Sequence, residues 1–353
     1  MYQVLGNIHV HSNYSDGNST IPEIARAAKA AGLAYVIITD HNSLEGLPEE
    51  GFIDDVLVLV GSEINNAKHH YLALGITAEI PPNDSDPQQV IDAVNRQNGL
   101  GFIAHPYEIG SPLVFNKQHF CWSKWEISGF TGMEVWNWCS QWRDGVRNLP
   151  QGLYYAYLNP YGPISGPCPQ SLARFDQISA QRRLVAIAGS DAHAWPIRRG
   201  IIRRTIFPYE FLFRTVNNCL LLESPLSGKL TEAKQQVYEA LRFGRSFIVN
   251  CRAGNPAGVI FAASDGQREY AIGQVVPFTD NASLQINCPH EFSGRLRHRI
   301  IHNGKLLDEI PGCNVSIKVT QPGTYRLEVY IHKKPWIFTN PIYFQTSSTQ
   351  GGD

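Results

Sequence analysis

The stretch Gly6-Asn7-Ile8-His9-Val10-His11-Ser12-Asn13-Tyr14-Ser15-Asp16-Gly17 decides the fold assignment, because it ends a short apolar run with a His-x-His pair. In a β-strand, residues i and i+2 point to the same face, so His9 and His11 are spaced to bind one ion. Asp16 adds a carboxylate shortly after this pair. The stretch predicts a strand whose end opens a metal site, although single histidines also serve as structural polar groups near a core.

Strand and helix patterns alternate on both sides of the His-x-His pair. An apolar strand over 6–10, a helix over 21–31 that begins with Pro22, and a strand over 35–39 give the βαβ signal of a parallel sheet or barrel. The alternation continues with strands over 56–60, 71–76, 101–104, 185–188 and 246–250, and with helices over 87–98 and 231–243. Because the strands are short and apolar, we expect an α/β fold with helices covering the sheet.

Two segments depart from this alternation. Residues 109–170 are rich in Gly, Pro, Trp and Tyr, which predicts a largely irregular insertion that either walls a substrate pocket or forms a satellite core. Beyond residue 253, short strand patterns follow one another between turn residues, over 257–262, 283–288, 297–301, 314–319 and 323–331. We therefore expect a barrel over 1–253, a smaller all-β sandwich over 254–345 and a disordered tail over 346–353.

The composition excludes several classes of protein. With 30 Lys and Arg against 31 Asp and Glu, the net charge of -1 provides no general attraction for nucleic acid. No apolar run reaches the length of a membrane span, and no leader pattern is present. The 7 cysteines show no Cys-x-x-Cys pairing, which favours free thiols in a reducing compartment. We expect a cytoplasmic protein.

Histidine and acidic residues cluster at the carboxyl ends of the predicted strands: His9, His11, Asp40, His41, Glu63, His105, Glu134, Asp191 and His193. In an α/β barrel these strand ends meet at one rim, which holds the active site. The donors are nitrogen and oxygen only, which suits Mn, Fe or Zn. The set is too large for one ion, and a carboxylate such as Glu63 can bridge two cations.

Six ordered motifs resemble those of the polymerase and histidinol phosphatase (PHP) family of metallohydrolases over about residues 1–250. They are His9-Val10-His11 with its following Asp16-Gly17, Thr39-Asp40-His41, Gly61-Ser62-Glu63, His70-Tyr71-Leu72-Ala73-Leu74-Gly75, Ala104-His105-Pro106 and Gly189-Ser190-Asp191-Ala192-His193. The resemblance implies a distorted (β/α)7 barrel, two or three divalent ions and, most often, phosphoester hydrolysis.

The resemblance also implies a ligand set. One ion is held by His9, His11, Glu63 and Asp191; a second shares Glu63 and uses His70 and His105; a third lies between Asp16, His41 and His193. Asp16 stands where many members have a histidine, which favours a harder ion there. We assign the family position to His70 rather than to the adjacent His69. Asp40 and Glu134 are expected to orient the ligand residues by contacting them without binding an ion themselves.

The expected reaction is hydrolysis of a phosphomonoester or phosphodiester, in a small molecule or short nucleotide, by a hydroxide that bridges two ions. Glu63, Asp191 and His193 are the expected catalytic residues, the last two also as candidates for proton transfer. Arg198, Arg199 and Arg143 are candidates for binding phosphate, although solvated surface charge is the more ordinary explanation for each. We expect no membrane and no stable nucleic-acid partner, and the sequence leaves the oligomeric state open.

Two other functions remain open at this stage. The same ions could cleave a carbamate or an ester, because the barrel, the late β-sandwich and the passage Ala240-Leu241-Arg242-Phe243-Gly244-Arg245-Ser246 resemble members that do so. Alternatively, the barrel is inert and the sandwich binds carbohydrate or a protein. The nearly complete ligand set argues against this last hypothesis.

Overall fold

The computed structural model describes residues 1–113, 117–199 and 202–346, with the side chains of 197–199 and 202–203 outside the description. The helices are α1 (Ile21–Ala30), α2 (Pro87–Arg96), α3 (Trp138–Gly145), α4 (Leu149–Tyr157), α5 (Pro169–Ser179), α6 (Tyr209–Phe213) and α7 (Leu230–Phe243). The strands up to residue 250 are β1 (Tyr2–Val10), β2 (Tyr35–His41), β3 (Gly51–Ile53), β4 (Val56–Ile64), β5 (Tyr71–Leu74), β6 (Leu100–Ile103), β7 (Gly132–Asn137), β8 (Val185–Gly189), β9 (Trp195–Arg199), β10 (Ile202–Ile206), β11 (Val216–Leu222) and β12 (Ser246–Asn250). The later strands are β13 (Ile260–Ser264), β14 (Glu269–Ala271), β15 (Val275–Pro277), β16 (Ser283–Asn287), β17 (Leu296–His302), β18 (Lys305–Pro311), β19 (Asn314–Lys318), β20 (Gly323–Ile331), β21 (Lys334–Thr339) and β22 (Ile342–Gln345).

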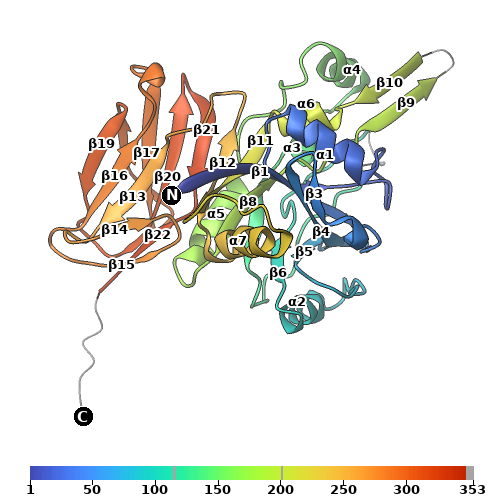
Figure 1. Ribbon diagram of the computed structural model, residues 1–353. Helices are drawn as coiled ribbons and strands as arrows, with labels where there is room; N and C mark the ends of the chain where they lie inside the picture. Colours follow the sequence, from blue (N-terminus) through green and yellow to red (C-terminus); the bar gives the residue numbers. More distant parts are fainter. Residues whose placement is uncertain (114–116, 200–201, 347–353) are drawn as a thin grey trace.

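The fold is mixed α/β, with one large sheet that runs through both halves of the chain (Figure 1). Its order includes β12-β11-β1-β2-β4-β5-β6-β7-β8. β1, β2 and β4 are parallel, as are β6, β7 and β8. The expectation of a parallel sheet or barrel is wrong at β5, which runs antiparallel to β4 and β6, and at β11 and β12, which are also antiparallel to their neighbours. The connection over 65–70 is too short for the crossover that a parallel neighbour of β4 requires.

β1, which lies between β11 and β2, approaches β8 at the end of this series. An isolated parallel bridge joins Val10 to Ala192, and the amides of His11 and Asp191 donate across the gap, to Ala192 O at 3.0 Å and His9 O at 2.9 Å. Among the described strands these contacts do not form a closed sheet. The barrel expected from the sequence is therefore not confirmed.

Two apolar clusters enclose the sheet. One lies on the side to which Ile8, Ile37 and Leu59 point, and α7 covers it with Val237 and Leu241. The other lies on the opposite side, where α1 and α2 pack their apolar faces, with Ile21, Ile24, Val36, Ile38, Val90 and Ile91 buried. Both faces of the strands are buried, as their apolar sequences predict.

The N-terminus of α1 shows how sequence sets an element's start. Thr20 and Glu23 form a capping box, and Pro22 occupies the first turn, where its missing N–H is not needed. The helix then buries Ile21, Ile24, Ala25 and Ala28 at helical spacing. This anchors the loop over 11–20 at the carboxyl end of β1.

A further all-β region follows β12. β14, β13, β16 and β19 form a separate sheet, while β15, β22, β20 and β21 continue the large sheet through the antiparallel pairing of β12 with β21. Side chains of both sheets enter one core, including Leu284, Ile286, Leu327, Val329 and Trp336. A buried ion pair also ties this region to α5, because Arg326 donates to both oxygens of Asp176 at 2.6 and 2.7 Å.

As expected, most of the described part of the aromatic segment 109–170 is irregular, but the segment also contains regular elements that the sequence did not predict. It contributes β7 to the large sheet, followed by α3 and α4, and irregular backbone is concentrated between β6 and β7. Trp136 and Trp138 are fully buried and belong to the main core. Burial against the sheet overrode the turn-rich composition.

All seven cysteines are free thiols, as their spacing predicted. No helix in the described part of the chain is long and apolar enough to cross a membrane. The predicted tail lies outside the described residues from 347 onward.

Candidate metal centre

A β-bulge brings the two leading histidines to the same face. The pairing of β1 with β2 shifts register between Ile8 and Val10, and His9 has a positive φ of 70°. Ile8 and Val10 therefore belong to clusters on opposite sides of the sheet, whereas the Nε2 atoms of His9 and His11 both approach the same Glu63 oxygen. The bulge re-aims one side chain, as bulges do beside active sites.

Glu63, near the end of β4, lies at the middle of the centre. Its Oε2 atom is 3.2 Å from His9 Nε2, 3.3 Å from His11 Nε2 and 3.1 Å from His41 Nδ1. Its Oε1 atom is 2.7 Å from His70 Nδ1 and 3.2 Å from His105 Nε2. One carboxylate thus presents each of its oxygens to a different group of imidazoles.

Two further carboxylates lie on the other side of the histidines. Asp191 Oδ1 is 3.4 Å from His9 Nε2 and 3.3 Å from His11 Nε2. Asp16 Oδ1 is 3.2 Å from His193 Nε2 and 3.5 Å from His41 Nε2. Three groups have donor atoms close enough to share an ion: His9, His11 and Asp191; His9, Glu63 and His105; and His11, Asp16, His41 and His193.

His70 reaches the centre because β5 is antiparallel. It lies immediately before Tyr71, so the amino end of β5 meets the rim formed by the carboxyl ends of the parallel strands. The adjacent His69 points elsewhere and contacts Ser123 Oγ at 2.9 Å. The choice of His70 over His69 agrees with this geometry, although His70 lies outside the three groups named above.

The backbone of the centre is held in uncommon conformations. His9, His105 and Asp191 have φ values of 70°, 24° and 54°, in the region that L-residues rarely adopt. Strain of this kind is kept where the surrounding structure imposes it, most often at functional sites. Gly189 is required for a related reason, since a Cβ there would lie 1.8 Å from Glu134 Oε1.

The two residues expected to orient ligands both lie behind the centre. Glu134 Oε1 is 3.0 Å from His9 Nδ1, and its Oε2 accepts from the His105 amide at 2.9 Å. Asp40 accepts from the amide and hydroxyl of Ser12 at 2.7 and 2.6 Å, and from Ser15 Oγ at 2.5 Å. Glu134 therefore fixes an imidazole, whereas Asp40 fixes the loop that carries Asp16.

The electrostatics of the centre divide the histidines. Burial opposes the charged form of each, but Glu63 raises the pKa of His41 to about 9, and Glu108 with Glu63 raises that of His105 to about 9. Burial, with the neighbouring His193 and His41, lowers the pKa of His11 to about 3. Protons on some imidazoles thus balance the carboxylates.

The carboxylates stay ionised despite their burial. Desolvation acts to raise the pKa of Glu63, but its histidine neighbours hold it well below the usual value. For Asp191 and Asp16, too, desolvation acts to raise the pKa and neighbouring histidines act to lower it. The histidines prevail, so the pKa of Asp191 is well below its usual value and that of Asp16 is lowered to about 2. Concentrated negative charge beside imidazoles is the electrostatic environment that a divalent cation requires.

Orphaned nitrogen atoms show that the residues present fit a metal. In the described chain, His9 Nε2, both nitrogens of His11, His41 Nδ1 and His70 Nε2 are buried without a hydrogen-bond partner. Buried polar atoms are normally paired, so such a concentration calls for an absent partner. Imidazole and carboxylate donors without thiolate fit Mn, Fe or Zn.

Of the three arginines expected to bind phosphate, only Arg143 has a described side chain, and it lies outside the three candidate metal-binding groups. Arg143 is buried and pairs with Glu108. Arg198 and Arg199 lie in β9, with side chains outside the described residues. Access from solvent is on the Asp16 side, where the Asp16 and His41 side chains are 52% and 25% exposed, against 1% for Glu63.

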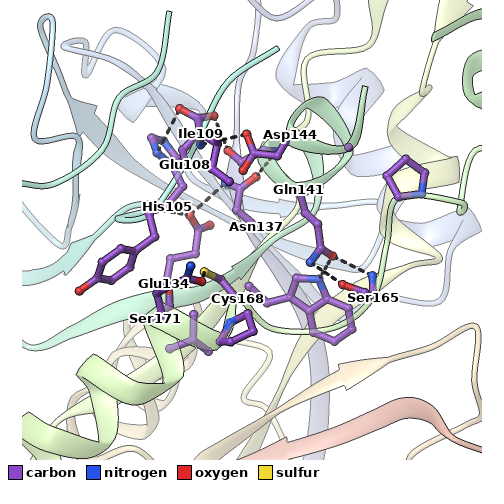
Figure 2. A pocket seen from close by; sticks show the side chains of 18 residues that line it. His105, Glu108, Ile109, Glu134, Asn137, Gln141, Asp144, Ser165, Cys168 and Ser171 are labelled. Atoms are coloured by element: carbon purple, nitrogen blue, oxygen red, sulfur yellow. Dashed lines mark hydrogen bonds and ion pairs between the residues drawn. The ribbon is translucent and has the colours of Figure 1, made fainter. Parts of the chain in front are cut away.

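A cavity of about 240 Å³ adjoins the centre behind His105 and Glu134 (Figure 2). Tyr107, Trp136, Gln141 and Ser165 are among its lining residues, and neither Lys nor Arg is among the described residues that line it. Sequence reasoning missed Glu108 and Asn137, which contact ligand residues here. Glu108 follows His105 by three positions, and this spacing was the one signal that could have revealed it.

Residues 7–120 match the model of the PHP domain. The uncharacterized protein MJ1587 of Methanocaldococcus jannaschii is 30% identical over 115 residues, which cover 29% of this chain and 67% of that protein. A crystal structure from Bacteroides vulgatus, of a two-domain protein containing a predicted PHP-like metal-dependent phosphoesterase, aligns over 96% of this chain and 95% of its own, at 15% identity and a TM-score of 0.46. The chain belongs to the PHP domain family.

Proposed function

We propose that this protein is a metal-dependent phosphoesterase that hydrolyses a phosphomonoester or phosphodiester of a small molecule or short nucleotide. The observation that carries the proposal is the position of Glu63, whose two oxygens face separate groups of imidazoles. A carboxylate in that position is suited to bridging two cations, and paired cations are a common means of activating water against phosphorus.

The proposed ligand set has three parts. His9, His11, Glu63 and Asp191 would hold one divalent ion; Glu63, His70 and His105 a second; and Asp16, His41 and His193 a third. The short distances among these donors and their orphaned nitrogens support the set. Mn, Fe or Zn is the proposed cofactor, because all donors are nitrogen or oxygen.

When bound, the ions would activate water and neutralise charge on the phosphoryl oxygens. The chain's own residues would prepare the site for this. Glu134 orients His9, and Asp40 orders the loop before α1 through Ser12 and Ser15. The Nδ1 atom of His193 lies 2.8 Å from Asp191 O, which fixes Nε2 toward the exposed side. His193, whose Nε2 lies 3.2 Å from Asp16 Oδ1, is the proposed group for moving a proton to the leaving oxygen when the third ion is not bound.

Metal content and activity on one sample test the proposal. Protein purified without a histidine tag or chelator is analysed by plasma mass spectrometry and assayed with p-nitrophenyl phosphate and bis-p-nitrophenyl phosphate. We expect two or three equivalents of Mn, Fe or Zn together with phosphate release or diester cleavage. Protein that holds no ion, and stays inert after Mn and Zn are added, would contradict the metal centre itself.

A carbamate or ester hydrolase is the second candidate. It is favoured by the cavity beside His105, which is lined by neutral and acidic groups among the described residues, and by the pairing of Arg143 with Glu108. A phosphate-binding cavity would be expected to carry a cation. Ion-loaded protein that cleaves aryl esters but neither phosphate substrate would establish this candidate over the first.

We further propose that β1, β2, β4–β8 form the distorted barrel of the family, which the bridge between Val10 and Ala192 supports. The proposed domain boundary lies near residue 254, after which all described strands belong to the β-rich region (Figure 1). A cytoplasmic location is proposed from the seven free cysteines. The proposed partner is a small-molecule phosphoester or short nucleotide substrate.

A further inference from the structure

The two nitrogens of His105 face two different carboxylates. Nε2 lies 3.2 Å from Glu63 Oε1, toward the metal centre. Nδ1 lies 4.0 Å from Glu108 Oε2, on the side away from the centre, and Figure 2 shows His105 beside Glu108. His9 has a closer form of this arrangement, with Nε2 toward Glu63 and Nδ1 hydrogen-bonded to Glu134 at 3.0 Å, whereas His105 and Glu108 are within ion-pair distance without a hydrogen bond. A carboxylate behind a ligating imidazole fixes the ring orientation and strengthens the ligand.

Glu108 is itself held from three directions. Its Oε1 accepts from Ser140 Oγ at 2.8 Å and pairs with Arg143, and its Oε2 accepts from the Phe120 amide at 2.9 Å. Glu108 and Arg143 are 7% and 8% exposed. Removing such an ion pair from water costs desolvation free energy, so a gain in protein stability does not by itself account for the pair.

Phe120 connects the same pair to the other histidine of the proposed second ion. Its ring stacks on His70 with centroids 4.4 Å apart and an angle of 27° between the planes. The Arg143 guanidinium lies 5.5 Å from the centroid of the Phe120 ring. Arg143, Glu108 and Phe120 therefore form one cluster, buried at Arg143 and Glu108 and half-buried at Phe120, that lies against both His70 and His105.

We infer that Glu108 and Arg143 are positioning residues that hold His105, and through Phe120 also His70, in place for one divalent ion. The inference rests on the proposed metal centre and adds a role for the aromatic segment between β6 and α4. It also gives Arg143 a function other than binding phosphate. The His11, Asp16, His41 and His193 group lacks described contacts with this cluster, so we expect the effect to fall mainly on the ion held by His70 and His105 and to spare the ion held by Asp16, His41 and His193.

Titration with Co²⁺ tests the inference through the visible absorption of the bound ion, which reports its ligands independently of activity. The variants are Glu108→Gln, Arg143→Met, Arg143→Lys and the milder Ser140→Ala, which removes one hydrogen bond to Glu108. The matched control is Arg204→Gln, because Arg204 is an exposed arginine stacked 4.4 Å from the Tyr157 ring.

We expect Glu108→Gln and Arg143→Met to weaken one class of Co²⁺ sites by roughly 10- to 100-fold and to change its spectrum, leaving at least one other class of sites unchanged. Arg143→Lys should retain more Co²⁺ affinity than Arg143→Met. Ser140→Ala should lose less Co²⁺ affinity than Glu108→Gln, and Arg204→Gln should bind Co²⁺ as the wild type does. If Glu108→Gln does not fold, Ser140→Ala and Arg143→Lys still decide the matter.

Two negative results are distinguishable. Wild-type protein that binds no Co²⁺, Mn²⁺ or Zn²⁺ overturns the proposed function and this inference with it. Wild-type protein that binds Co²⁺, with folded variants that have the same affinities and spectra, overturns the inference alone and leaves the proposed function intact. Uniform weakening of every site would also overturn it, because the contacts predict an effect mainly on one ion.

Discussion

The Nδ1 atom of His9 lies 3.0 Å from Oε1 of Glu134, on the side of the ring opposite the Nε2 atom that faces Glu63. Both side chains are buried, and Glu134 Oε2 also accepts from Asn137 Nδ2 at 2.9 Å. The carboxylate therefore determines which nitrogen of His9 is directed at the centre. Gly189 allows this contact, because any side chain there would collide with Glu134.

Glu134→Gln should lower metal affinity by roughly 10- to 100-fold, because the isosteric amide keeps the shape but loses the charge behind His9. Competition with a fluorescent chelator measures the change. Gly189→Ala should act in the same direction by displacing the carboxylate. Glu126→Gln serves as a control in the same segment. Unchanged affinity in both variants would contradict the orienting role of Glu134.

Glu63→Gln should lower metal affinity by more than the roughly 100-fold upper limit expected for residues that only support a ligand. The reason is that the two ions lose the carboxylate they share. The fold should persist, since the amide has the same volume in the same buried place. Metal content, turnover and circular dichroism are measured on the same preparation. Normal turnover by folded Glu63→Gln protein would refute the bridging role.

Replacement of the two adjacent histidines should separate their roles. His70→Asn removes a nitrogen 2.7 Å from Glu63, whereas His69→Asn removes a contact to Ser123 at 2.9 Å. We expect the first to lose about one equivalent of metal and most activity, and the second to retain both. Mass spectrometry and the phosphatase assay measure the difference. Equal losses of bound metal and activity in the two variants would show that the assignment of His70 as the ligand is wrong.

Metal affinity should rise with pH between 6.5 and 8.5. In the metal-free protein, the pKa values of His41 and His105 are raised to about 9, so these rings hold protons that a cation must displace. Their protonated forms dominate below pH 9, and competition weakens as pH approaches that value. Calorimetric titration with Zn²⁺ in buffers of different ionisation enthalpy should detect proton release at pH 7. An affinity that is constant over this range would contradict the raised values.

Arg326→Met should lower the free energy of unfolding by about 3–5 kcal/mol, because it leaves Asp176 buried without its bidentate partner. The pair joins β20 to α5, so the loss weakens the contact between the β-rich region and the rest of the chain. Urea denaturation measures the change. The control is Arg214→Met, whose exposed pair with Glu210 should contribute at most about 1 kcal/mol. A similar small effect for Arg326→Met would show that the buried pair is dispensable.

Several elements of the fold could be read from local pattern because their burial is periodic. The start of α1 at Ile21 follows from Thr20, Pro22 and Glu23, and the end of α7 at Phe243 follows from Gly244, which has a positive φ of 66°. Short apolar strands such as β2 and β4 are buried on both faces, which their composition already predicts. Local signals failed where packing decided instead, as in β7, whose sequence reads as part of an aromatic loop.

The sequence by itself determined which residue types gather at the rim, because strand ends in an α/β protein place their following residues together. His9, Glu63, His105 and Asp191 were all identifiable in this way. Tertiary structure alone decided how they meet. The bulge at His9, the reversed direction of β5 that delivers His70, and the pairing of Glu108 with Arg143 all depend on contacts between segments distant in the chain. Such contacts leave no periodic trace in sequence, because their geometry is set by packing rather than by local backbone preference.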